Sequence, residues 1–185
     1  MTRGPFFLCA ALAASPAAAD SLCGVTDMAE LSGLAGSWQG LEHRSFESLD
    51  MSRLDEGMVG VALAETPAGL TFETPVLLDM TDEALLANLV PGALDVDAVD
   101  ALLETTDHED AADLLSDTPC GPGDLPQFVA SVTVSAEIEV EARVTVIAYF
   151  TDRLLSVVEM TGRSDEAFLY VTMTTLLTRA DQATE

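Results

Sequence analysis

The chain has 185 residues and a formal charge of −25, from 32 acidic and 7 basic residues, and every basic residue is arginine. A field of this sign repels phosphate backbones and anionic lipid headgroups, so the composition disfavours binding to nucleic acids or membrane surfaces. With 12 glycines and 8 prolines the chain is not rich enough in these residues to be disordered. Two explanations of the acidity stay open: solubility in a salty medium, where ions screen self-repulsion, and attraction of a cationic partner.

Residues 1–19 have the pattern of a secretory signal peptide. Arg3 precedes an apolar run over 6–14, which is too short to span a bilayer, and three alanines precede Asp20. We expect cleavage before Asp20, a periplasmic or extracellular location and no membrane span after cleavage. The alternative is an N-terminal membrane anchor. The mature chain, 20–185, then carries a formal charge of −26 and has the length of one domain.

Cys23 and Cys120 both lie in this mature chain. In an oxidising compartment a disulfide between them is the economical interpretation. Closing a loop of this length stabilises a fold by about 4 kcal/mol in the chain-entropy model. The alternative, a reactive thiol pair, lacks the C-x-x-C spacing that lowers a cysteine pKa.

The first predicted elements are a short helix and a strand. Apolar residues at helical spacing over 26–36 end at glycine and predict one or two turns of helix. A strand is predicted over 37–49, with Trp38 and Phe46 on one face. Its alternation is weak, because Glu42 and Arg44 share that parity.

Alternation is clearer over 56–65 and 69–80, which predict two further strands joined by a Pro-Ala-Gly turn. The character of the sequence changes over 81–120, where we expect three acidic amphipathic helices, capped by Thr81, Asp95 and Thr106. From 79 to 124 there are 13 acidic residues and no arginine.

Strands return at 127. All even-numbered residues from Phe128 to Phe150 are apolar, while their odd neighbours are mostly polar. A single strand of this length would extend past about 70 Å, so we expect a turn or bend near 135–139. Because the parity is kept, the sequence predicts either an odd-numbered hairpin loop or one bent strand. Two more strands are predicted at about 153–162 and 166–178.

These observations predict a mainly β fold with a helical insertion (α+β). The expected architecture is an antiparallel meander barrel of about seven strands, with about three acidic helices inserted between the third and fourth strands. The pattern resembles the lipocalins and the broader calycin superfamily at Gly36 and Trp38, at Thr151 and Asp152, and at Arg179. The resemblance implies that Trp38 packs across the closed end of the barrel and that Arg179 lies over it. The late turn departs from the family, since Arg153 stands where tyrosine is usual.

The resemblance also implies that the barrel binds a small apolar ligand in its interior. The residues expected to line that interior are Phe72, Phe128, Val132, Val144, Val146 and Val171. The alternative is a periplasmic protein-interaction module with a filled core, in which the acidic helices over 81–117 contact a basic protein partner.

Catalytic and metal-binding patterns are scarce. The only histidines are His43 and His108, which are far apart in sequence, and Asp95, Asp97 and Asp100 do not complete a calcium loop. No glycine-rich phosphate loop or G-x-S-x-G motif occurs. We therefore expect no enzyme activity, no metal and no cofactor. A cleft joining either histidine to a nucleophile would favour the remaining alternative, a hydrolase.

Overall fold

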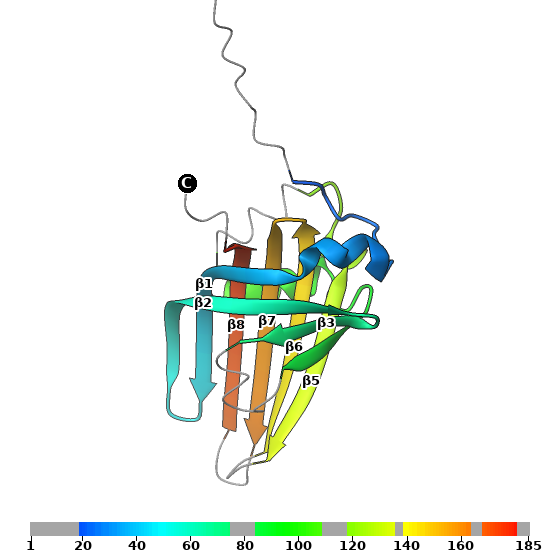
Figure 1. Ribbon diagram of the computed structural model, residues 1–185. Coiled ribbons are helices and arrows are strands. Elements are labelled where there is room, and N and C mark those ends of the chain that lie inside the picture. The colour runs from blue at the N-terminus through cyan, green and yellow to red at the C-terminus, as the bar shows by residue number, and fades with distance from the viewer. Residues whose placement is uncertain (1–18, 75–83, 109–117, 136–138, 164–167, 181–185) are drawn as a thin grey trace, which may run out of the picture.

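Eight antiparallel strands form a closed barrel in which each strand pairs with the next and β8 returns to pair with β1 (Figure 1). The computed structural model describes residues 19–74, 84–108, 118–135, 139–163 and 168–180. The strands are β1 (Gly36–Ser48), β2 (Ser52–Thr66), β3 (Gly69–Glu73), β4 (Leu85–Leu89), β5 (Gln127–Ser135), β6 (Glu139–Phe150), β7 (Arg153–Arg163) and β8 (Phe168–Arg179). The expected signal peptide lies outside the described residues, except for Ala19.

The barrel confirms the predicted mainly β meander but has eight strands instead of about seven. The additional strand is β4, in the segment where the first inserted helix was expected. That expectation was wrong. In β4 the apolar residues Leu85, Ala87 and Leu89 lie on one face, as the alternation of a strand requires. β4 pairs with β3 on one side and with β5 on the other, and so connects these two strands in the sheet. Closure of the sheet therefore overrides the helical spacing of the leucines.

Two of the other predicted helices can be compared with the structure. The N-terminal one is the 3-10 helix η1 (Met28–Leu34), and the second inserted helix is α2 (Val96–Thr105). Asp95 caps α2 as expected, because its side chain accepts a hydrogen bond from the amide of Ala98 at 2.9 Å. The third inserted helix falls largely on 109–117, outside the described residues. A short 3-10 turn, η2 (Pro122–Asp124), leads into β5.

The long alternating segment is a hairpin and not one bent strand. Ser135 faces Glu139 at its end, so β5 and β6 are separated by three residues and the even-numbered side chains stay on one face. The predicted odd-numbered loop is confirmed in length, although 136–138 lie outside the described residues.

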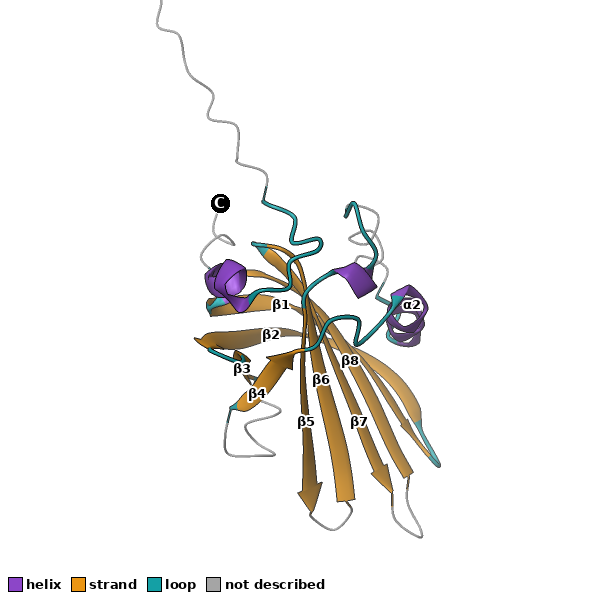
Figure 2. Cartoon of the chain, turned by 90° about the vertical axis from the view of Figure 1, so that its right-hand side faces the viewer, coloured by secondary structure: helices purple, strands orange, loops and turns teal. Residues whose placement is uncertain are grey.

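Two apolar clusters stabilise the fold on opposite faces of the sheet. The first lines the barrel interior and includes Trp38, Leu63, Phe72 and Phe128. The second lies outside the barrel, where Val99, Leu102 and Leu103 of α2 pack near β6 and β7 residues such as Tyr149 and Leu155. Figure 2 shows α2 on the outside of the barrel wall. The sheet therefore buries both faces in the region of α2, which explains the apolar residues at outward-facing positions.

The disulfide between Cys23 and Cys120 is confirmed, with an S–S distance of 2.02 Å. The N-terminal arm that it anchors also bonds to the barrel, since the amide of Leu22 donates to the carbonyl of Tyr149 at 3.0 Å. The amide of Thr151 donates to the carbonyl of Asp20 at 3.2 Å. The arm is thus held at the turn between β6 and β7.

Candidate functional site

One end of the barrel is closed by η1, Trp38 and Arg179. The guanidinium carbon of Arg179 lies 4.3 Å from the centroid of the Trp38 ring, and the indole Nε1 donates to the carbonyl of Leu34 at 3.0 Å. Arg179 also donates to the carbonyls of Ala35, at 2.8 Å, and of Gly33. Because Trp38 is only 1% exposed, the cation stacks on a ring that is shielded from water. We call this assembly the closed end.

Five of the six residues expected to line a ligand site belong to the interior apolar cluster. Phe72, Phe128, Val144, Val146 and Val171 are all buried there. Val132 is half-buried and lies farther along β5 from the closed end. The expectation that these side chains share one face of the sheet therefore agrees with the register.

Burial of the inward side chains decreases along β1, β7 and β8 away from the closed end. Phe46, Met160 and Leu169 pack against the interior cluster but are only partly buried. They lie on β1, β7 and β8 at similar distances from the closed end. Phe46 and Met160 both pair with Val171 of β8, and Leu169 is two residues from Val171 on the same strand. We call this region, together with Val132, the mouth of the barrel.

Charged side chains also face inward near the mouth. Glu42 and Arg44 share the inward parity of Trp38 and Phe46, and Arg44 donates a hydrogen bond to Glu42. Glu42 is 8% exposed, which makes it the one acidic residue among the buried polar residues described. The sequence had indicated these two residues only as a defect in strand alternation.

The two histidines meet on the outer face of the barrel. The rings of His43 and His108 stack with centroids 4.0 Å apart and planes 10° from parallel. His108 Nδ1 lies 2.8 Å from Thr174 Oγ1, which in turn lies 2.7 Å from Thr106 Oγ1. The stack thus joins the segment after α2 to β1 and β8.

This arrangement does not resemble a metal centre. In nearly parallel rings the in-plane lone pairs point along separate planes and do not converge on one ion. Within the described residues no group of three or more histidine, cysteine or carboxylate side chains could hold a metal ion. A hollow of about 310 Å³ beside His43 contains Thr106, but its hydroxyl donates to the carbonyl of Leu102. We therefore propose no catalysis there.

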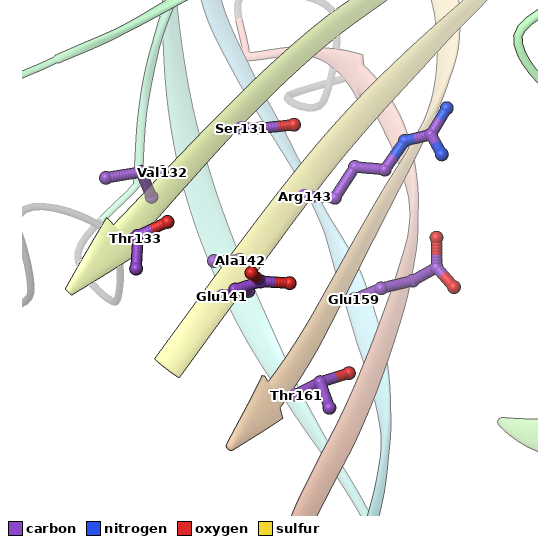
Figure 3. Close-up of a pocket in the computed structure, with 8 residues that line it drawn as sticks. All are labelled: Ser131, Val132, Thr133, Glu141, Ala142, Arg143, Glu159 and Thr161. Atoms are coloured by element: carbon purple, nitrogen blue, oxygen red, sulfur yellow. The ribbon is translucent and has the colours of Figure 1, made fainter. Parts of the chain in front are cut away.

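A second hollow, of about 410 Å³, lies over β5, β6 and β7. Figure 3 shows Ser131, Arg143, Glu159 and Thr161 pointing to one side of these strands, while Val132 points to the other. Because its lining is mostly polar and open, this hollow does not offer the dry surroundings that an apolar ligand needs.

The fold defines a closed eight-stranded antiparallel meander barrel with an apolar interior. Beyond this class no relative is found: no protein-family model, no curated protein and no solved structure matches the chain. In the described part of the chain, no helix combines the length and apolar character that crossing a bilayer requires. Any functional conclusion therefore rests on the chemistry of the site.

Proposed function

We propose that this protein is a lipocalin-like carrier that binds a small apolar ligand inside its barrel. The ligand enters through the mouth. The observation that supports this function is the decrease in burial along the inward side of β1, β7 and β8. At the closed end the inward side chains are sealed beneath η1 and Trp38, whereas at the mouth Phe46, Met160 and Leu169 keep part of their apolar surface exposed. Exposed apolar surface facing inward costs free energy in water, and an apolar ligand would cover it.

A fluorescent apolar probe tests this proposal. Titration of the mature protein with uncharged N-phenyl-1-naphthylamine should give saturable enhancement of probe emission. Met160→Trp places a larger ring at the mouth and should weaken the enhancement, because it occupies the space that the probe needs. Met58→Trp is the matched control, since Met58 is 70% exposed on β2 and its partner Leu41 has the outward parity. A wild-type protein that does not bind, or equal binding by both variants, would contradict the proposal.

A second candidate is a protein-interaction module, as favoured by the outer surface of the β1–β2 hairpin. Five of the eight exposed large hydrophobic residues described lie on this hairpin or at its tip: Leu41, Leu49, Met51, Leu54 and Met58. An apolar surface of this kind often marks a protein contact. The acidic side of α2 is a separate surface on which a basic partner would dock.

Cross-linking in a periplasmic extract tests this second candidate. A partner specific to the hairpin should be captured by the wild-type protein and lost from a Leu54→Ser, Met58→Ser variant. Capture that is unchanged by these substitutions would count against a hairpin interface.

A further inference from the structure

We propose that Glu42 and Arg44 form a recognition site for the polar head of an uncharged amphiphile, one whose head both accepts and donates hydrogen bonds, such as a hydroxyl or an amide. This inference rests on the proposed ligand-binding function and specifies its ligand class. The apolar tail would lie among the inward residues of the interior cluster.

The first observation is where the pair lies. On β8 the cross-strand partners of Glu42 and Arg44 are Thr175 and Met173, both buried on the inner face. Side-chain exposure is 10% for Glu42 and 37% for Arg44. The carboxylate is therefore nearly withdrawn from water, while part of the Arg44 side chain stays accessible.

The second observation is that packing alone does not account for the pair. Withdrawing a charge from water is unfavourable, and well-packed apolar residues often replace a buried ion pair without loss of stability. Apolar residues occupy the neighbouring inward positions on the β8 side, including Val171 and Met173, whereas the partner of Arg44 on β2 is Asp55. We infer that a charged pair at this position serves specificity.

The third observation is an unused donor. Arg44 Nε is buried and has no hydrogen-bond partner in the part of the chain that the structure describes. Buried donors are almost always satisfied in native proteins, so a ligand acceptor near Arg44 would complete this group. The carboxylate of Glu42 can only accept hydrogen bonds, and it would accept one from the same ligand head.

The charge balance selects an uncharged head. Glu42 already neutralises Arg44. On β2, Arg53 lies 2.8 Å from Asp55, which is the cross-strand partner of Arg44. Two of the chain's seven arginines are thus balanced at the mouth of a protein with a charge of −25. An anionic head would place a second negative charge beside the guanidinium of Arg44, in a protein whose net charge is already negative, so its binding is disfavoured. A cationic head would compete with Arg44 for the carboxylate of Glu42 and would also be disfavoured.

Calorimetric titration of the mature protein with three ligands of equal chain length tests this inference. Decanol, decanoate and decylammonium differ only in the head. We expect decanol to bind at least about tenfold more tightly than either ion, a difference of about 1.4 kcal/mol. Arg44→Gln should weaken decanol binding by about tenfold. Glu42→Gln should strengthen decanoate binding, because it leaves Arg44 unpaired.

Arg143→Gln is the matched control, since it removes an arginine that is exposed on β6 and points away from the barrel interior, and it should leave the order of affinities unchanged. Equal affinity for the three heads would overturn the inference while leaving the carrier function intact. If none of the three ligands binds and the uncharged probe also fails to bind, the carrier function itself fails and this inference fails with it. The affinities of the wild-type protein for decanol, decanoate and decylammonium test the inference even if a variant does not fold.

Discussion

Replacing Arg179 with alanine tests how the closed end is held together. The substitution removes a cation 4.3 Å from the Trp38 ring centroid and the donors to the carbonyls of Ala35 and Gly33. A partly desolvated cation–π contact is worth about 1–2 kcal/mol. The two charge-assisted hydrogen bonds add about 1–2 kcal/mol together once their partial exposure to water is discounted. We therefore expect the free energy of unfolding to fall by about 3 kcal/mol.

Urea denaturation followed by Trp38 fluorescence and by circular dichroism measures this loss. The emission of Trp38, the only tryptophan, should also shift to longer wavelength, because the ring is 1% exposed only while the closed end is intact. Arg179→Lys keeps the charge but not the planar fork and should give an intermediate loss.

Arg163→Ala is the matched control, since it removes the same charge from the end of a neighbouring strand. Its guanidinium carbon lies 5.8 Å from the Phe168 ring centroid, and the residue is exposed. We expect this control to cost less than about 0.5 kcal/mol. The reasoning is refuted if Arg179→Ala is no more destabilising than Arg163→Ala, or if it leaves the emission of Trp38 unchanged.

Three further predictions concern stability. Gly40→Ala should lower the free energy of unfolding by more than about 2 kcal/mol in thermal melts, because the added Cβ would lie 2.1 Å from the Leu176 carbonyl oxygen. Gly57→Ala is the control and should not cause this loss, since a Cβ there would meet no atom within 4 Å. Reducing the disulfide should cost up to about 4 kcal/mol in urea titrations, and a Cys23→Ser, Cys120→Ser variant should not respond to reductant. Burial, and then the charge of Asp100, raise the pKa of Tyr149, so the stability this residue contributes is complete below about pH 10 and declines as pH rises further. Tyr149→Phe should remove that decline in urea titrations between about pH 8 and 11, and a decline of equal slope in the variant would refute the assignment.

Much of the barrel could be predicted because its pattern is local. The even-numbered residues of 128–150 alternate over many positions, so both the faces of β5 and β6 and the length of their connection follow from parity. The inward placement of Phe72 and Val171 follows in the same way. Trp38 and Arg179 were associated only through the resemblance, because their strands pair across most of the chain.

The misassigned segment shows where local pattern is insufficient. Leu85, Leu86 and Leu89 fit a helix turn as well as Leu85, Ala87 and Leu89 fit a strand, and only the neighbouring strands β3 and β5 decide between them. The stacking of His43 on His108 likewise depends on how α2 lies against the barrel. Glu42 and Arg44 did carry a local signal, since they break the apolar parity of β1, but only closure of the barrel turns that break into an inward-facing pair.

Pairing of the first strand with the last affects how the chain acquires its fold. Trp38 faces Arg179 across β1 and β8, so the arginine that covers the tryptophan is made long after it during synthesis. A chain interrupted before Phe168 lacks β8 and exposes two sheet edges together with the apolar residues they enclose. Contacts this distant in sequence slow folding, because a long loop must close before they form. The nascent chain therefore cannot complete the barrel until its final strand is available, and until then its first strand is open to pairing with other chains.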